Sequence, residues 1–359
     1  MRVHILGLAH TVSTPAYSQC AFTQKVVKIC RMLTRAGHEV FHYGHAQSEV
    51  EAQNIYCVGT VDHDDAYPGW DWRTQGFPPF KVDDLAYRVF NSFAISEIGK
   101  RKQPGDFLLA PFGYAQQPVA DAHKDMLVVE SGIGYGGGMF APYKVFESYA
   151  LMHAYRGLDA VCHASNEHWY DVVIPNYYDP DEFVYQEVKQ DYLLHMGRLG
   201  VGKGTHIAID LARKTGHKLV VAGPLGDYKL PSDVEYVGVV GPRERAKLLA
   251  NAKALLCPST YVEPFCGVMV EAFLSGTPVI STDFGAFVEY NPHGYTGFRC
   301  RTFGDFMRAV EEIGEIRPED CYNHGMWFSL DSVWPQYERY FQDIQNVYSG
   351  AGWYSTSGR

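Results

Sequence analysis

Short, continuous apolar runs alternate with amphipathic segments along almost the whole chain of 359 residues. The runs are rich in Val, Ile and Leu, as in strands that helices cover on both faces. They occur at residues 3–9, 106–113, 125–132, 191–200, 217–226 and 255–259. Between them, apolar residues recur at helical spacing, for example over 20–40, where the pattern ends at Gly37. This alternation predicts an α/β fold built from doubly wound parallel sheets.

The strand–helix series starts twice, so we predict two Rossmann-like domains. The periodicity is lost and charge collects near residues 180–191. We therefore predict an N-terminal domain over 1–187 and a C-terminal domain over 188–330. The aromatic-rich remainder, 331–359, reads as one or two amphipathic helices with a frayed end. Two open sheets in one chain predict a cleft at the carboxyl ends of their strands, where such sheets bind ligands.

Composition and charge argue against several classes of binding partner for this chain. The formal net charge of −10 argues against binding to phosphate backbones or anionic lipid, although a local groove can oppose it. The eight cysteines show no C-x-x-C or metal-finger spacing, so no structural zinc is predicted. No apolar run reaches the ~20 residues of a membrane-spanning helix. The start lacks the features of a signal peptide, so we expect a cytoplasmic protein.

The stretch EPFCGVMVE, residues 263–271, carries two glutamates around an apolar run. Glu263 falls in the loop after a predicted strand, and Glu271 falls about one turn into the following helix. The first amides of that helix, at Cys266, Gly267 and Val268, form a site suited to an anion. Amides that can bind an anion thus lie between two carboxylates that can accept hydrogen bonds. This arrangement suits a sugar nucleotide, in which a diphosphate lies between the hydroxyls of the sugar and those of the ribose. The alternative is a capped helix with a solvated Glu271.

A second candidate, GRLGVGKG at residues 197–204, directly follows the first strand of the second domain. Its glycines allow the backbone to approach a ligand closely. Arg198 and Lys203 can offset the charge of a diphosphate. The alternative is a flexible turn with two surface cations.

Taken in order, these motifs resemble a known family. The segments are GR-x4-KG, VVAGPLG, VEYVGVVGPRERAKLLANAKALLCPS, E-x7-E and SGTPVISTDFGAFVE. Together they resemble the C-terminal domain of glycosyltransferase family 4, over roughly residues 190–300. IPNYYDPDEF, residues 174–183, resembles the family's hinge segment, with Tyr177 at a position where glycine is usual. The resemblance implies the GT-B architecture, with two Rossmann-like domains facing a cleft. The N-terminal domain would lie on the acceptor side, the C-terminal domain would bind the nucleotide-sugar, and a helix within 331–359 would return to the N-terminal domain.

The resemblance also implies roles for individual residues. Arg198 and Lys203 would bind the donor diphosphate and stabilise it as it leaves. Glu263 would contact the donor sugar near the reacting carbon, and Glu271 the ribose hydroxyls. The remaining donor-binding residues would be Cys266, Gly267, Val268, Gly223 and Val240. No cofactor or divalent metal is implied, since the nucleotide-sugar is a co-substrate.

The first loop, LAHTVSTPAYSQCAF, departs from the family pattern because it lacks the usual glycine pair. His10 and Thr11 are candidates to replace it near the phosphates or the acceptor. An ordinary strand–helix loop is an equally good interpretation. A further departure is EPFC, where Cys266 stands at a position that is commonly glycine.

The acceptor side is predicted around VVESGIGYGGGMF, residues 128–140. Glu130 follows a strand and is a candidate contact for the acceptor hydroxyl. Gly134 and Tyr135 belong to a glycine- and aromatic-rich loop whose ring could stack on a sugar. A loop without a ligand is the alternative.

The resulting prediction is a retaining, metal-independent glycosyltransferase. It would transfer a sugar from a nucleotide-sugar donor to a hydroxyl of a glycan or small molecule. One alternative is a non-catalytic sugar-nucleotide binder, which the altered first loop favours. Another is a transferase acting on modified bases of DNA, which the acidic net charge disfavours.

Overall fold

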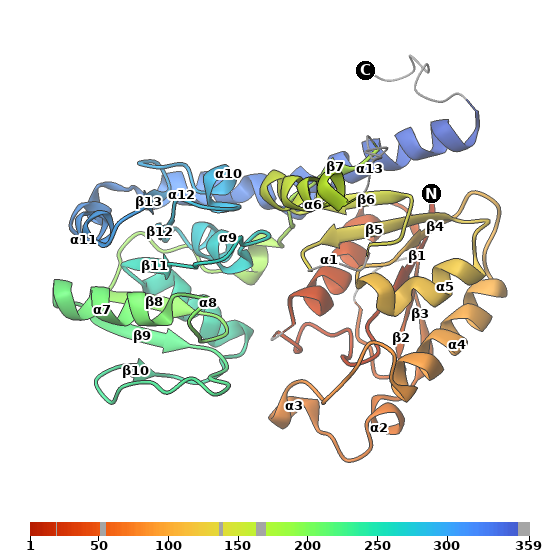
Figure 1. Cartoon of the computed structure of the whole chain (residues 1–359), viewed down its shortest axis with the longest axis horizontal. Coiled ribbons are helices and arrows are strands. Elements are labelled where there is room, and N and C mark those ends of the chain that lie inside the picture. The colour runs from red at the N-terminus through yellow and green to blue at the C-terminus, as the bar shows by residue number, and fades with distance from the viewer. Residues whose placement is uncertain (19, 51–54, 136–138, 163–169, 351–359) are drawn as a thin grey trace. The chain divides into compact units, whose positions relative to one another are not determined.

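The computed structural model describes residues 1–18, 20–50, 55–135, 139–162 and 170–350 (Figure 1). The chain divides into two compact units. Unit 1 comprises Met1–Glu147, Asn166–Tyr177 and Val333–Arg359, and unit 2 comprises Ser148–Ser165 and Tyr178–Ser332. Each unit contains one parallel β-sheet, so the predicted α/β fold is confirmed.

The sheet of unit 1 has seven strands in the order β3-β2-β1-β4-β5-β6-β7. The strands are β1 Arg2–Leu6, β2 Glu39–His45, β3 Ile55–Val61, β4 Phe107–Leu109, β5 Leu127–Ile133, β6 Tyr143–Phe146 and β7 Val172–Val173. The helices are α1 Ala21–Arg35, α2 His63–Ala66, α3 Trp72–Gln75, α4 Leu85–Gly99 and α5 Gln117–Ala122. The strands β1, β4 and β5 are buried, as expected for apolar runs covered on both faces.

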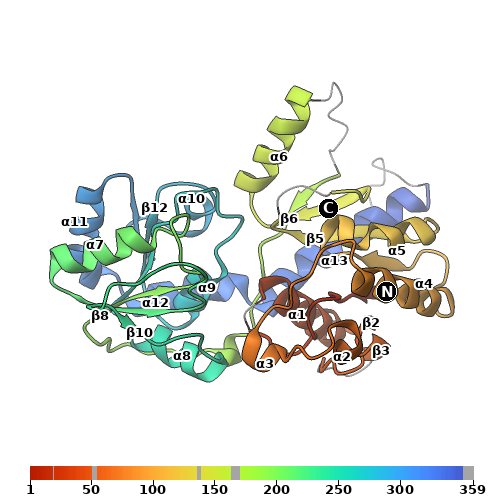
Figure 2. The same cartoon turned by 60° about the horizontal axis from the view of Figure 1, so that its bottom comes forward.

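The sheet of unit 2 has six strands in the order β10-β9-β8-β11-β12-β13. The strands are β8 Tyr192–Met196, β9 Lys218–Ala222, β10 Glu235–Tyr236, β11 Ala254–Cys257, β12 Val279–Thr282 and β13 Gly297–Cys300. The helices are α6 Tyr149–Cys162, α7 Thr205–Thr215, α8 Pro242–Asn251, α9 Gly267–Leu274, α10 Phe287–Tyr290, α11 Phe303–Glu312 and α12 Pro318–Gly325 (Figure 2). Its core is formed by the apolar faces of the strands other than β10 and of helices α7 to α12.

Both sheets have the strand order in which the first strand of the series lies beside the fourth. The direction of the connections reverses at this point, and open α/β sheets bind ligands beyond the carboxyl ends of the strands at such a position. In unit 2 the two central strands are β8 and β11. The sequence motifs around Lys203 and Glu263 follow these two strands.

The boundaries of the two units differ from the predicted division at residue 187, because each unit combines segments from separate parts of the chain. Residues 148–165 group with unit 2, where Glu289 accepts hydrogen bonds from the amides of Tyr149 and Ala150. The last helix, α13 Leu330–Tyr348, begins in unit 2 and continues in unit 1. In unit 1 its Phe341 packs on Phe107, with ring centroids 4.7 Å apart.

Candidate functional site

The loops that follow β8 and β11 touch each other in unit 2. Gly204 ends the first loop with a φ of +68°, a left-handed conformation that favours glycine. A Cβ atom at this position would lie 2.0 Å from the carbonyl oxygen of Pro258, in the second loop. Only glycine therefore allows this approach, which brings the two predicted motifs together.

Lys203 and Glu263 form an ion pair across these loops. The Lys203 Nζ lies 2.6 Å from Glu263 Oε1, and Ser259 Oγ donates to the same oxygen at 2.6 Å. Glu263 is only 2% exposed. Burial by itself would lower the pKa of Lys203, but the Glu263 carboxylate, together with Cys266 and Tyr261, raises that pKa above its ordinary value. The site therefore holds a charged ammonium whose other protons can reach an anion.

Tyr261 belongs to the same cluster, although the sequence analysis did not select it. The Lys203 Nζ lies 5.2 Å from the centre of its ring. Burial, followed by the Glu263 carboxylate, raises the pKa of Tyr261 to about 12. The phenol therefore stays protonated at neutral pH. Its position two residues before Glu263 was the available signal.

Arg198 is exposed and lies in the loop after β8. Within the part of the chain that the structure describes, its guanidinium has no ion-pair partner. The predicted pair of cations thus divides into Lys203, held by Glu263, and Arg198, which faces solvent. An unpaired surface cation is available to a phosphate.

The first turn of α9 follows Glu263 directly. The amide of Met269 donates to Cys266 O at 3.0 Å, so the preceding amides, at Gly267 and Val268, are the free donors of this helix end. Cys266 has a φ of +69°, and it is the one non-glycine residue with positive φ in the described ranges. Its thiol donates to Cys257 Sγ at 3.8 Å. The commonly found glycine would adopt this backbone without strain.

Glu271 is the fifth residue of α9 and is 7% exposed. Its Oε2 lies 3.4 Å from Arg245 Nε, on α8. The sequence analysis did not select Arg245, because a basic residue near the start of a charged helix reads as a solvated one. The carboxylate of Glu271 is therefore oriented by a cation and is not simply solvated.

Gly223 and Val240 lie after β9 and β10. Gly223 has a φ of +127°, and a Cβ atom there would lie 2.0 Å from Gly197 O, in the loop after β8. Its amide donates to Gly238 O at 2.8 Å. Val240 is buried. The structure thus gives Gly223 a packing role, which holds the loops of neighbouring strands together.

In unit 1, His10 and Thr11 are enclosed by protein groups. His10 is 2% exposed, its Nδ1 lies 2.7 Å from the Tyr87 hydroxyl, and its ring stacks on Phe80 with centroids 3.6 Å apart. Burial lowers the pKa of His10 to about 3. Thr11 Oγ1 lies 2.5 Å from Thr23 Oγ1. In this structure both side chains hold the first loop in place.

Glu130 is fully buried and anchors the loop that follows β5. Its Oε1 accepts from the Tyr135 hydroxyl at 2.9 Å. Its Oε2 accepts from the amides of Phe140 and Ala141, each at 2.9 Å. Burial raises the pKa of Glu130, although these donors oppose the shift. Both oxygens thus have partners within the loop, and the contact with an acceptor hydroxyl stays a prediction.

Gly134 allows another carboxylate to approach this loop. A Cβ atom at Gly134 would lie 2.7 Å from Glu147 Oε2. Glu147 is ion-paired with Lys25, whose Nζ also donates to Gly132 O at 3.0 Å. Burial lowers the pKa of Lys25 to about 7. This pair could not be predicted, because a lysine within a helix pattern reads as solvated. Residues 136–138 of the glycine-rich loop lie outside the described residues.

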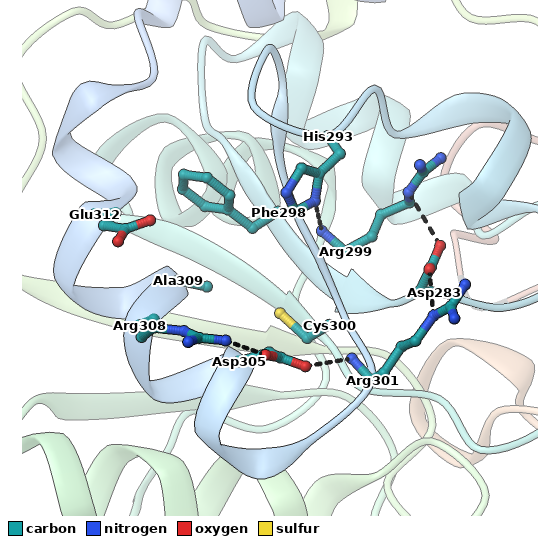
Figure 3. A pocket seen from close by; sticks show the side chains of 10 residues that line it. All are labelled: Asp283, His293, Phe298, Arg299, Cys300, Arg301, Asp305, Arg308, Ala309 and Glu312. Carbon is teal, nitrogen blue, oxygen red and sulfur yellow. Dashed lines mark hydrogen bonds and ion pairs between the residues drawn. The ribbon is translucent and has the colours of Figure 1, made fainter.

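A cavity of about 440 Å³ lies elsewhere in unit 2, beside β13 and α11 (Figure 3). None of the predicted site residues lines it. Its Asp283 is bound by Arg299 Nε at 3.2 Å and by Arg301 Nε at 2.7 Å. Asp283 precedes Gly285, where a Cβ atom would lie 3.0 Å from the amide nitrogen of Glu263. The charges in this cavity therefore support the loop that packs against Glu263.

The described residues hold neither a metal-binding cluster nor a membrane-spanning helix. Among them, no group of three or more His, Cys, Asp or Glu side chains is arranged to hold a metal ion. No helix within the same residues has the length and apolar character required to cross a membrane.

Comparison with known sequences identifies the segment that carries these motifs. Residues 180–319 match the family described as Glycosyl transferases group 1. A glycogen synthase of Mycobacterium tuberculosis is 33% identical over 138 residues, which cover 34% of this chain and 33% of that enzyme. The chain thus matches about a third of the length of this curated relative. All residues predicted on the donor side lie within the family match.

Comparison with solved structures covers nearly the whole chain. AviGT4, a glycosyltransferase involved in avilamycin A biosynthesis, has a TM-score of 0.70 at 21% identity, over 97% of this chain and 98% of that one. A sucrose-phosphate synthase from Thermosynechococcus elongatus has a TM-score of 0.68 at 13% identity, over 96% and 99% of the two chains. HepE of Anabaena, in complex with UDP and glucose, has a TM-score of 0.65 at 15% identity, over 95% and 99%. At these identities the likeness shows a shared fold.

Proposed function

We propose that the chain is a retaining glycosyltransferase that transfers a sugar from a nucleotide-sugar to a hydroxyl of a carbohydrate or small-molecule acceptor. The observation that carries the proposal is the ion pair between the partly exposed Lys203 and the buried Glu263, beside the first amides of α9. The family match over residues 180–319 supports it. Because HepE was solved with UDP and glucose, UDP-sugars are the first donors to test.

The charges of the site suit this chemistry. In the transfer, the bond between the anomeric carbon and the β-phosphate oxygen breaks, and the acceptor oxygen bonds to that carbon. The acceptor proton leaves with the nucleoside diphosphate. Negative charge therefore develops on the diphosphate, where Lys203, Arg198 and the amides of Gly267 and Val268 would stabilise it. Fixed cations and dipoles of this kind supply the role that a divalent metal has in other transferases, so we propose a metal-independent reaction.

The glutamates would bind the two ends of the donor. Glu263, next to Lys203, would contact the sugar near the reacting carbon. Glu271, oriented by Arg245, would accept hydrogen bonds from the ribose hydroxyls. Retention would follow if the acceptor attacks from the face that the diphosphate leaves, with no enzyme nucleophile.

The test is turnover of a panel of UDP-, GDP- and ADP-sugars by the wild type and by Lys203→Ala. Removal of one charge-stabilising group in such a site lowers kcat by about 10²–10³-fold, and we expect this loss. Because Lys203→Ala leaves the buried Glu263 unpaired, the double variant Lys203→Met/Glu263→Gln provides a folded reference. Lys218→Ala is the matched control, since Lys218 forms an exposed ion pair with Glu235 in the same unit.

The outcomes separate the two classes of function. Slow release of one nucleotide, lost in Lys203→Ala and kept in Lys218→Ala, supports the transferase and names its donor. Stabilisation by one nucleotide without turnover in the presence of glycan and small-molecule acceptors favours the non-catalytic binder. Absence of both binding and turnover contradicts the proposal.

A further inference from the structure

The chain passes from unit 1 to unit 2 between two adjacent tyrosines, Tyr177 and Tyr178. The backbone of Tyr178 is fixed on both sides. Its amide donates to Phe328 O at 2.8 Å, and its carbonyl accepts from the amide of Leu330 at 2.9 Å. The chain passes back from unit 2 to unit 1 between Ser332 and Val333, two residues after Leu330. Tyr178 is thus held where the two connecting segments meet.

The side chains of the two tyrosines enter different units. The Tyr177 hydroxyl donates to Lys25 O at 3.4 Å, and its ring packs edge-on against Tyr337 at 5.8 Å; both partners belong to unit 1. The ring of Tyr178 stacks on Phe265 in unit 2, with centroids 6.4 Å apart and planes at 15°. The two hydroxyls therefore serve different environments although the residues are neighbours.

The hydroxyl of Tyr178 lies against the first residue of α9. A Cβ atom built on Gly267 would lie 2.5 Å from Tyr178 Oη, whereas the next ring atom, Cζ, would lie 3.7 Å away. The hydroxyl alone thus makes this contact close. Gly267 is a glycine because the phenol oxygen occupies the space that a side chain would fill.

The surroundings of this hydroxyl are polar although Tyr178 is only 5% exposed. Burial raises the pKa of Tyr178 well above its ordinary value, and the Glu271 carboxylate adds to this shift while Arg245 opposes it. The phenol is therefore protonated and interacts with the carboxylate and guanidinium that orient each other. A buried tyrosine hydroxyl is retained where it has such polar neighbours.

We infer that Tyr178 is a positioning residue for the nucleotide end of the donor. Its hydroxyl holds the first turn of α9 and the Glu271–Arg245 pair in place. The amide of Gly267 is then positioned to bind the diphosphate, and the Glu271 carboxylate to bind the ribose. This role rests on the proposed function. It goes beyond that function because it assigns the donor site a residue from the segment that connects the units.

The first experiment compares Tyr178→Phe with Tyr177→Phe, two changes that each remove one hydroxyl from neighbouring residues. Binding of UDP, GDP and ADP is measured by calorimetry, and KM and kcat are measured with the donor that the wild type uses. Loss of one hydrogen-bonding group is worth about 1 kcal/mol, or about fivefold. We expect Kd and donor KM to rise about fivefold in Tyr178→Phe, with kcat within about twofold of the wild type. We expect Tyr177→Phe to bind like the wild type.

The second experiment tests the contact itself with a double-mutant cycle. Gly267→Ala should weaken nucleotide binding by about tenfold or more, because its Cβ meets the phenol oxygen. In the Tyr178→Phe background the same methyl group meets only Cζ, at an ordinary contact distance. Gly267→Ala should therefore weaken binding by less than about twofold there. Such non-additivity is expected only for residues in contact, and a general loss of stability would not produce this rescue.

The outcomes distinguish this inference from the proposed function. If the wild type binds a nucleoside diphosphate and Tyr178→Phe binds it equally well, the positioning role is wrong and the transferase proposal stands. The same conclusion follows if Gly267→Ala is equally harmful in both backgrounds. If the wild type binds none of the three nucleotides, both ideas are overturned.

Discussion

Cys266 has a side chain that is unfavourable for the backbone conformation it adopts. Its φ of +69° lies in the left-handed region, which costs an L-residue with a Cβ atom roughly 1–2 kcal/mol. The thiol lies 3.8 Å from Cys257 Sγ, in a buried site. The chain thus keeps a strained side chain at the start of the helix whose amides we assign to the diphosphate.

Replacing Cys266 by glycine and by alanine separates the strain from the loss of the thiol. Both variants lose the sulfur, but only alanine keeps the Cβ atom. We expect Cys266→Gly to be more stable than Cys266→Ala by about 1 kcal/mol, measured by denaturant unfolding. The same pair at Cys257, within strand β11, should show the opposite order because glycine weakens a strand. Equal stability of the two Cys266 variants would show that the strain is absent.

At the scale of elements, helix α6 is capped by a residue far away in the chain. Glu289 accepts from the amides of Tyr149 at 2.9 Å and Ala150 at 2.7 Å. Ser148 Oγ accepts from Leu151 N at 3.2 Å, and Ser148 O accepts from Met152 N at 3.1 Å. All four initial amides of α6 therefore have acceptors, and two of these amides donate to Glu289, on α10. A carboxylate at this end also opposes the helix dipole.

Glu289→Ala should loosen the start of α6 without unfolding unit 2. Loss of a helix cap costs about 1 kcal/mol, so we expect amide exchange in the first turn of α6 to accelerate by about fivefold or more. Hydrogen exchange with mass spectrometry measures this change. Glu311→Ala, an exposed glutamate on α11, is the control and should leave α6 unchanged. Uniform acceleration across unit 2 would contradict a local capping role.

At the scale of the whole molecule, buried histidines are concentrated in unit 1. Burial lowers the pKa of His10 to about 3 and those of His42 and His45 to about 4. In unit 2, burial lowers the pKa of His195 to about 4. These imidazoles are neutral in the folded protein, whereas the unfolded chain protonates them near pH 6.5. Between about pH 6.5 and pH 4 the unfolded state binds more protons, so stability falls as the pH falls.

We therefore expect unit 1 to lose its structure first on acidification. Hydrogen exchange, corrected for the intrinsic effect of pH, should show loss of protection in the strands of unit 1 before those of unit 2. His42→Gln should make the stability of unit 1 less dependent on pH in this range. His206→Gln, at an exposed position in unit 2, serves as the control. Simultaneous loss of both units, with no effect of His42→Gln, would contradict this assignment.

The sequence by itself determined the fold class, and it placed the motifs of Lys203 and Glu263 after strands of the second domain. Apolar runs alternating with helical patterns predict parallel sheets, because each run must be covered on both faces. Lys203 and Glu263 follow strands whose carboxyl ends meet at one sheet edge, so their proximity could be predicted and their 2.6 Å contact agrees with it. Such inferences succeed because they depend on local periodicity and on the direction of strands.

Only the tertiary structure decided which polar side chains are enclosed and by what. Glu130 and His10 look available in the sequence, but the folded chain encloses both. The distant Tyr87 hydrogen-bonds to His10, and Glu130 accepts from its own loop, which folds back on it. Lys25 looks solvated, yet it is buried against Glu147. Tyr178 looks like a loop residue, yet its hydroxyl lies beside Gly267. Burial and hydrogen bonding depend on contacts between residues far apart in the chain, which neither composition nor spacing specifies.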